Sequence, residues 1–207
     1  SESERERLRK KLFPNYLNKK ILLHAATPYS WSYLLPYINL TQEEYIKNIN
    51  DLIKTVKNMK NIFLIVRIRL KSFPGLSLKD LKSMLVQSES FDICVDESFE
   101  ELLAISDLLI SYSSTAIEEA LQSDIPVLQY DPYDRYSHIE GVNMKKYKNI
   151  EPSSVYYVGS QEDLSWSLKW IINNHLYKNP AELKKDWEVH KLNPEKNWLD
   201  KILKKNN

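Results

Sequence analysis

The stretch that decides the fold is Asp107-Leu-Leu-Ile-Ser-Tyr-Ser-Ser-Thr-Ala-Ile-Glu-Glu-Ala-Leu-Gln-Ser-Asp-Ile-Pro-Val-Leu-Gln-Tyr130. It predicts a buried strand at residues 108–111, a hydroxyl-rich turn, a helix at 115–122 and a second buried strand at 126–130. A helix N-terminus leaves backbone N–H groups without intrahelical partners, and serine or threonine hydroxyls beside them can bind the same anion. The stretch therefore predicts an anion site at the turn, of a kind that suits a diphosphate.

Apolar runs of the same kind recur along the rest of the chain. They predict strands at residues 21–26, 61–68, 91–96 and 154–158, and helical spacing or capping residues predict helices at 42–58, 77–88 and 98–106. Strands that are apolar at nearly every position are typical of a parallel sheet with helices on both faces, and the intervening helices imply right-handed crossovers. We predict an α/β fold, a Rossmann-like doubly wound parallel sheet of about six strands.

The chain divides into three parts. Residues 1–20 are charged and predict a linker or an N-terminal helix, and residues 21–160 form the Rossmann-like nucleotide-binding domain. Residues 161–207 carry apolar residues at helical spacing and predict C-terminal helices packed on the same domain. Since the chain begins with Ser1 rather than methionine, we expect it to be a piece of a longer protein.

Composition excludes several classes of protein and site. The chain has 29 Lys and Arg against 28 Asp and Glu, and this balance argues against nucleic acid as a partner. Cys94 is the single cysteine, which excludes an intrachain disulfide, argues against a thiolate zinc site and fits a reducing cytoplasm. His24 lies inside a predicted strand, so we predict a core residue with satisfied hydrogen bonds. No apolar run reaches the roughly 18 to 20 residues that span a bilayer, and we expect neither a metal ion nor a cofactor.

Glycine is too scarce for the common nucleotide-binding loops. The three glycines lie at positions 75, 141 and 159, so neither GxGxxG nor GxxxxGK(S/T) is present. Their absence argues against a dinucleotide oxidoreductase and a P-loop NTPase. Ser113, Ser114 and Thr115 stand in place of the glycines. An alternative without any ligand is plain helix capping, with Thr115 as the N-cap and Glu118 as its capping-box partner.

Polar residues follow the predicted strands at the edge where parallel sheets bind ligands. Thr27 and Ser30 follow the first strand, Arg67 and Arg69 the second, and His138 the fifth. The two arginines alternate, so they share one side of the chain and offer paired donors to a phosphate; a solvated strand end is the alternative. His138 is placed to meet a phosphate or a sugar, and its alternative is an ordinary loop histidine.

Residues 111–127 resemble the nucleotide-binding segment in the C-terminal domain of two-Rossmann (GT-B) glycosyltransferases. This group includes CDP-glycerol glycerophosphotransferases, capsular-polysaccharide transferases and the related UDP-N-acetylglucosamine 2-epimerases. The resemblance covers residues 91–136. It implies that a diphosphate is held by the hydroxyl turn, here Ser113, Ser114 and Thr115, and a ribose by a glutamate, here Glu119. The strand-end position adds Thr27, Ser30 and Arg67 as further candidates for nucleotide contacts.

The chain departs from the family's pattern at three places. It has Ser111-Tyr-Ser-Ser where the glycerophosphotransferases have Asp-Tyr-Ser-Ser, and Arg67-Ile-Arg69 where they have His-Pro. Retaining GT-B enzymes carry two glutamates eight positions apart, but Ser111 stands eight positions before Glu119 (119 − 111 = 8). These departures favour an inverting or phosphotransfer-type chemistry, for which His138 and Arg69 are the catalytic candidates.

The resemblance implies the donor-binding domain of an enzyme, a glycosyltransferase or glycerophosphotransferase of cell-surface polysaccharide synthesis. Its substrate would be a nucleotide-diphosphate-activated sugar or polyol, CDP- or UDP-linked. An N-terminal acceptor domain outside this chain would complete the active site, so the chain alone is expected to be inactive. The expected location is the cytoplasm, at the inner face of the membrane if the missing part associates with lipid. The alternatives are a sugar-nucleotide epimerase of the same architecture and a non-catalytic α/β scaffold.

Overall fold

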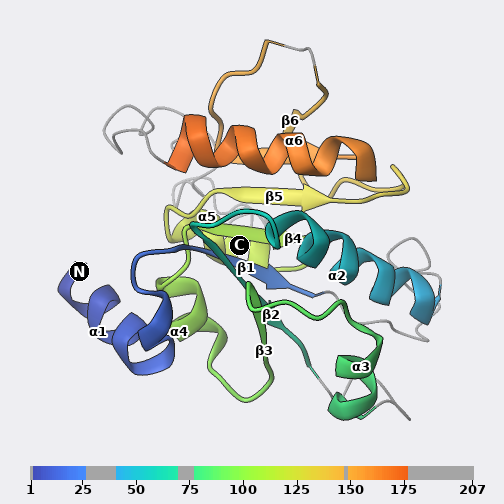
Figure 1. The fold of residues 1–207 in the computed structure, drawn as a ribbon. Helices are drawn as coiled ribbons and strands as arrows, with labels where there is room; N and C mark the ends of the chain where they lie inside the picture. The colour runs from blue at the N-terminus through green and yellow to red at the C-terminus, as the bar shows by residue number, and fades with distance from the viewer. Residues whose placement is uncertain (1, 27–40, 70–76, 147–148, 177–207) are drawn as a thin grey trace, which may run out of the picture.

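The computed structural model describes residues 2–26, 41–69, 77–146 and 149–176, and within them the chain forms a seven-stranded sheet (Figure 1). The strand order is β3-β2-β1-β4-β5-β7-β6, and every neighbouring pair is parallel. The predicted doubly wound α/β fold is confirmed, but the predicted count of six strands is too low because it omits β6. The strands are β1 (Lys20–Ala25), β2 (Ile62–Arg67), β3 (Phe91–Cys94), β4 (Leu108–Ser111), β5 (Val127–Tyr130), β6 (Val142–Asn143) and β7 (Val155–Val158).

Helices cover both faces of the sheet. α2, α3 and α6 pack on one face, and α1, α4 and α5 pack on the other. None of the helices in the described residues is long and apolar enough to cross a membrane. The helices are α1 (Glu2–Leu12), α2 (Gln42–Val56), α3 (Leu78–Met84), α4 (Phe99–Ala104), α5 (Ala116–Gln122) and α6 (Gln161–Ile171), with a 3-10 turn η1 (Pro14–Tyr16) and a π-helical turn η3 (Ile172–Leu176).

Alternate residues along the strands face two separate cores. Leu22 and Leu64 pack against α2, α3 and α6, whereas their neighbours Leu23 and Ile65 pack against the helices of the opposite face. All four side chains are fully buried. The central strands therefore have no solvent face, which explains why their sequences are apolar at nearly every position.

The strand order reverses between β1 and β4. From this point β2 and β3 extend to one side, and β5, β7 and β6 extend to the other. In open parallel sheets such a reversal opens a crevice outside the carboxyl ends of the two strands, and ligands bind there. The ends in this sheet are Ala25 and Ser111, so the topology predicts a site next to them.

α3 is shorter than its sequence predicts. The expected helix runs to residue 88, but α3 ends at Met84, and Leu85 already has an extended backbone. Asn50 of α2 accounts for the difference, since its amide nitrogen donates to the carbonyl of Met84 (3.1 Å) and its amide oxygen accepts from the N–H of Val86 (2.7 Å). These tertiary bonds occupy backbone groups that a longer helix would have paired within itself.

Asp107, directly before β4, ties α1 to the amino ends of the strands. Its carboxylate accepts hydrogen bonds from Arg5 (2.9 Å) and Arg9 (2.8 Å) of α1. It also accepts from the backbone N–H of Ile21 in β1 (2.8 Å). Both arginines donate in addition to the carbonyl of Ile105 at the end of α4. Burial alone would raise the pKa of Asp107, but Arg5 and the other partners together hold it below its ordinary value.

Two reactive side chains are buried in strands. His24 of β1 places Nδ1 3.1 Å from the carbonyl oxygen of Ile110 in β4. Burial lowers the pKa of His24 to about 4, although the bond to Ile110 acts in the opposite direction. His24 is therefore neutral near pH 7, and its prediction as a satisfied core residue is confirmed. Cys94 of β3 is also buried, and burial raises the pKa of its thiol to about 12.

Candidate functional site

A cavity of about 80 Å³ lies at the carboxyl ends of β1 and β2, next to the switch point, where the strand order reverses. We call it the switch-point cavity. It brings five of the predicted site residues together, while the predicted residues Thr27 and Ser30 lie outside the described part of the chain. Its wall includes two small residues at and after the end of β1 and residues of the turn before α5. The lining residues are Ala25, Ala26, Arg67, Arg69, Phe99, Ser114, Thr115, Ala116 and Glu119.

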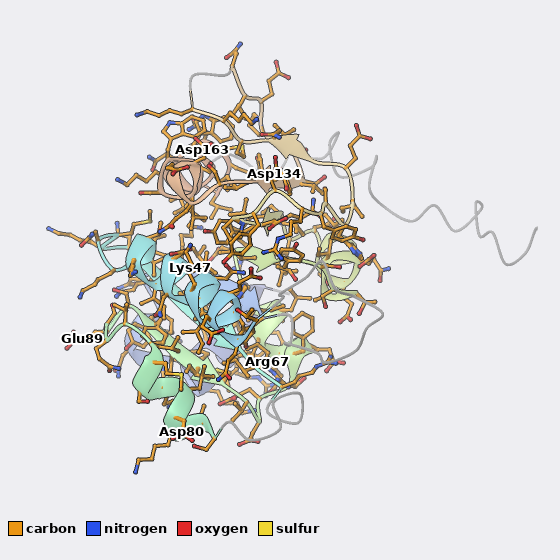
Figure 2. All side chains as sticks on the ribbon, turned by 90° about the vertical axis from the view of Figure 1, so that its right-hand side faces the viewer. Lys47, Arg67, Asp80, Glu89, Asp134 and Asp163 are labelled. Atoms are coloured by element: carbon orange, nitrogen blue, oxygen red, sulfur yellow. The ribbon has the colours of Figure 1, made fainter. Side chains whose placement is uncertain are left out.

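Arg67 is the last residue of β2 and pairs with Ala25 of β1 in the parallel register (Figure 2). Its Nη1 donates to the carbonyl of Ile68 at 2.7 Å. Its Nε is shielded from solvent and has no hydrogen-bond partner. A buried donor without a partner costs about 1–3 kcal/mol, and guanidinium groups bind phosphate or carboxylate oxygens through paired N–H groups. Arg67 is therefore suited to an anion in the cavity.

The turn before α5 presents the hydroxyls of Ser114 and Thr115 to the cavity. The Ser114 hydroxyl oxygen accepts the backbone N–H of Ala116 at 3.2 Å. The side chain of Thr115 makes no capping hydrogen bond to α5, and Glu118 is bonded to His138 instead. The alternative in which Thr115 and Glu118 form a capping box is therefore wrong.

The charges around the cavity favour an anionic ligand. Two guanidinium groups, Arg67 and Arg69, face one carboxylate, Glu119, which leaves a net charge of 2 − 1 = +1. α5 has only seven residues, so the arginines rather than the helix dipole supply most of the positive field. The exposed Glu119 carboxylate can accept hydrogen bonds from the hydroxyls of a ligand.

Ser113 does not line this cavity, because its side chain turns to His138. The Ser113 hydroxyl oxygen lies 3.1 Å from Nδ1 of His138, and Nε2 of His138 lies 2.8 Å from Oε1 of Glu118. His138 thus contacts the turn before α5 through one ring nitrogen and the first turns of α5 through the other. The sequence indicated Ser113 and His138 as site residues but not Glu118.

The loop after β5, residues 131–139, is held by buried side chains. The carboxylate of Asp131 accepts the backbone N–H groups of Tyr133 (3.0 Å), Arg135 and Tyr136 (2.9 Å). The amide oxygen of Gln129 accepts the N–H groups of His138 (2.8 Å) and Ile139 (3.1 Å). Asp131 and Gln129 are each 1% exposed, so these bonds fix the backbone that carries His138.

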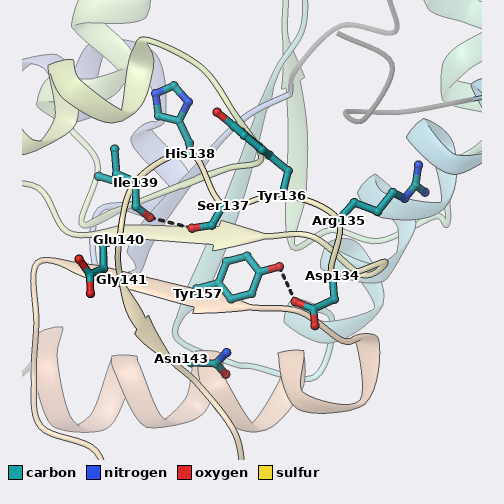
Figure 3. A pocket seen from close by; sticks show the side chains of 10 residues that line it. All are labelled: Asp134, Arg135, Tyr136, Ser137, His138, Ile139, Glu140, Gly141, Asn143 and Tyr157. Carbon is teal, nitrogen blue, oxygen red and sulfur yellow. Dashed lines mark hydrogen bonds between the residues drawn. The ribbon is translucent and has the colours of Figure 1, made fainter.

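A second cavity, of about 510 Å³, lies between this loop and β7 (Figure 3). Its rim is fixed at two places: Tyr157 of β7 donates to Asp134 (2.7 Å), and Arg135 donates to Glu44 of α2 (2.8 Å). Burial raises the pKa of Tyr157, so its hydroxyl keeps its proton. The lining residues are Asp134, Arg135, Tyr136, Ser137, His138, Ile139, Glu140, Gly141, Asn143 and Tyr157. Of these residues only His138 is indicated by the sequence, because the others come from a loop and from two strands at the edge of the sheet.

Within residues 2–26, 41–69, 77–146 and 149–176, no three His, Cys, Asp or Glu side chains come together in a way that could hold a metal ion. Arg67 and Arg69 supply positive charge at the cavity.

Comparisons of the sequence with protein-family models and with curated proteins give no match. Solved structures do match. The UDP-GlcNAc 2-epimerase from Neisseria meningitidis bound to UDP-GlcNAc aligns at 19% identity and a TM-score of 0.55, over 98% of this chain and 49% of that one. HepE from Anabaena in complex with UDP and glucose aligns at 14% identity and a TM-score of 0.55, over 92% and 46%.

A variant of the wall teichoic acid polymerase TagF aligns at 17% identity and a TM-score of 0.55, over 100% of this chain and 48% of that one. The chain thus spans about half the length of each of these three structures. At these identities the likeness establishes the fold, and it agrees with the family resemblance of residues 111–127. The chain has the Rossmann-like fold of one half of the GT-B architecture.

Proposed function

We propose that this chain is the donor-binding domain of a transferase that uses a nucleotide-diphosphate-activated sugar or polyol in cell-surface polysaccharide synthesis. The cavity at the switch point carries this proposal, because it combines two arginines, two hydroxyls and one carboxylate. The similarity to HepE in complex with UDP and glucose supports a nucleotide-linked donor. The similarity to the wall teichoic acid polymerase TagF supports a polymer-forming reaction.

Each cavity residue has its own role in this proposal. Arg67 and Arg69 balance the negative charge of the diphosphate, which grows as the bond to the sugar or polyol breaks. Ser114 and Thr115 donate hydrogen bonds to the phosphate oxygens, and Glu119 accepts hydrogen bonds from the ribose hydroxyls. The general base that activates the acceptor would come from outside this chain, and Arg69 and His138 are the candidates within it for contact with the reacting group.

The remaining parts of the enzyme would be supplied by a longer protein. We propose an acceptor-binding domain outside this chain, since the chain covers about half of each of the three structures described above. On this basis the isolated chain binds nucleotide but does not turn over. A cytoplasmic location at the inner face of the membrane, reached through the missing part, would give access to nucleotide-activated donors.

A sugar-nucleotide epimerase is the second candidate. Its support is the alignment of 98% of this chain with the Neisseria meningitidis epimerase bound to UDP-GlcNAc. The two functions differ in their need for an acceptor. Proton NMR of the full-length protein with UDP-GlcNAc distinguishes them. Conversion of UDP-GlcNAc to its 2-epimer without any acceptor supports the epimerase. Consumption of the donor only in the presence of an acceptor supports the transferase.

Glu119→Ala is expected to weaken the binding of UDP or CDP by about 1–3 kcal/mol, because a hydrogen bond between a carboxylate and the ribose is lost. Isothermal titration calorimetry with UDP, CDP and GDP measures this change. A ligand without ribose hydroxyls, such as 2′,3′-dideoxy-UDP, should bind the wild-type protein as weakly as UDP binds the variant. The dideoxy ligand should bind the wild type and Glu119→Ala equally, since it cannot form the hydrogen bond between the ribose and Glu119.

Glu162→Ala is the matched control, because Glu162 is an exposed carboxylate in the first turn of α6. It should leave the affinity unchanged. If Glu119→Ala binds UDP as tightly as the wild type, the ribose role of Glu119 is wrong. If the wild type binds none of the three nucleotides, the chain is a scaffold rather than a donor-binding domain.

Arg67→Ala is expected to weaken UDP binding by roughly 10- to 100-fold, because hydrogen bonds from a charged donor to phosphate contribute about 1.5–3 kcal/mol. Arg67→Lys should recover part of the loss, since it keeps the charge but not the paired N–H geometry. The control is Arg7→Ala, which removes an exposed arginine of α1 whose ion-pair partner is Glu4. Uridine, which has no phosphate, should bind the wild type and Arg67→Ala alike, and a loss of uridine affinity would contradict the phosphate role.

A further inference from the structure

The two adjacent glutamates of α5 face different surroundings. Glu119 lines the switch-point cavity, where the proposed function places a ribose. Glu118 points to the loop after β5, where its Oε1 lies 2.8 Å from Nε2 of His138. Neighbouring residues on a helix point about 100° apart, so the pair can serve two partners at once.

Ser113, His138 and Glu118 form a continuous chain of hydrogen bonds. Because carboxylate oxygens only accept, Nε2 of His138 carries the hydrogen and donates it to Glu118. In the neutral ring Nδ1 then has no hydrogen, so it accepts from the Ser113 hydroxyl at 3.1 Å. Glu118 therefore determines which nitrogen of the neutral ring carries the hydrogen.

Both ends of this chain belong to the same segment. Ser113 lies in the turn before α5, and Glu118 lies in α5. The imidazole of His138 thus bridges the turn to the helix, and the cavity-lining Ser114 and Thr115 lie between the two anchored positions. Thr115 makes no capping bond to α5, so side-chain support for the turn comes from this bridge and from the Ser114 hydroxyl, which accepts the N–H of Ala116.

The surroundings of Glu118 point to a role other than stability. Its second oxygen, Oε2, is shielded from solvent and has no hydrogen-bond partner. Leaving a buried polar atom unpaired destabilises a fold, so a residue selected only for stability would not carry it. The backbone of His138 is in addition fixed by Gln129, which gives the bridge a rigid support.

We propose that Glu118 is a positioning residue: acting through His138, it holds the Ser113–Thr115 turn in the geometry that binds the diphosphate. This role rests on the proposed function, because it concerns the same nucleotide site. Neither Glu118 nor His138 is among the residues that line the cavity. The affinity for nucleoside diphosphate then depends on a carboxylate that lies outside the cavity.

The test compares four variants in UDP titrations. Glu118→Ala should weaken UDP binding roughly tenfold, the size expected for losing one hydrogen bond in the chain, whereas Glu118→Gln should stay within about twofold because its amide oxygen still accepts from Nε2. Ser113→Ala should lose a similar factor. The double variant Ser113→Ala/Glu118→Ala should bind UDP no more weakly than the weaker-binding single variant, because both changes break the same chain of hydrogen bonds.

Glu140→Ala is the control, since Glu140 is an exposed carboxylate directly after the same loop, and it should not change the affinity. Amide hydrogen exchange without nucleotide provides a second measurement: Ala116 should exchange faster in Glu118→Ala and at the wild-type rate in Glu118→Gln. The positioning role alone is overturned in two cases, both with a wild type that binds UDP. In the first, Glu118→Ala binds UDP as tightly as the wild type; in the second, the losses of the two single variants add up in the double variant. A wild type that binds neither UDP nor CDP overturns the proposed function and this role with it.

Discussion

Asp107→Ala is expected to lower the free energy of unfolding by about 4 kcal/mol, because it leaves two largely buried arginines without their carboxylate. The side chains of Arg5 and Arg9 are only 29% and 15% exposed, and that of Asp107 is 8% exposed. The variant also removes the partner of the Ile21 N–H. Urea unfolding at pH 7, followed by circular dichroism, measures the change.

Glu101→Gln is the matched control, because Glu101 of α4 forms an exposed ion pair with Lys11 of α1. It should change stability by less than about 0.5 kcal/mol, as exposed pairs contribute little. The pKa of Asp107 is lower in the folded state, so its contribution is complete at neutral pH and is lost as the pH falls below the ordinary value of 3.8. A loss of under 1 kcal/mol for Asp107→Ala at pH 7 would show that the network is not a major support.

Lowering the pH from 6.5 to 4 is expected to remove roughly 3 kcal/mol of stability through His24 alone. The folded-state pKa of about 4 lies below the ordinary value of 6.5. Within this interval the unfolded chain therefore binds a proton that the folded chain does not, and stability falls as the pH falls. The affected position adjoins Ala25 and Ala26 of the cavity wall.

The comparison of wild type with His24→Asn isolates this effect. The asparagine amide can still donate to the carbonyl of Ile110, but it does not titrate. Urea midpoints measured at intervals from pH 7 to pH 4 should therefore fall less steeply in the variant. Two parallel pH profiles would mean that His24 does not have the lowered pKa, since all other titrating groups are common to both proteins.

The strands could be predicted from sequence to the extent that they are long and buried. β1 and β2 are apolar at consecutive positions because both of their faces lie in a core, and this pattern is visible without a structure. β6 could not be predicted, since it consists of Val142–Asn143 alone and two residues carry no periodicity. The end of α3 was predicted four residues late (88 − 84 = 4) because it depends on Asn50 of α2, and sequence spacing does not reveal such tertiary contacts.

The cavity could be predicted in part, because the residues that follow parallel strands meet at one edge of the sheet. This rule brings Arg67 and Arg69 next to Ser114. The local spacing of Thr115 and Glu118 suggested a capping box, but His138, twenty residues after Glu118 (138 − 118 = 20), takes the glutamate instead. Sequence position thus brings five of the predicted residues to one cavity, whereas the separate bridge of Ser113, His138 and Glu118 depends on the loop after β5.

The replacement of glycine by hydroxyl residues in the turn before α5 has a consequence for evolution. A glycine loop binds phosphate through main-chain N–H groups, which substitutions other than proline leave in place. In this chain the hydroxyl residues that line the cavity are Ser114 and Thr115, and a single nucleotide change in the gene can remove either side chain and keep the other. Under the proposed function, the affinity for the diphosphate can then change in small steps, without any rebuilding of the backbone.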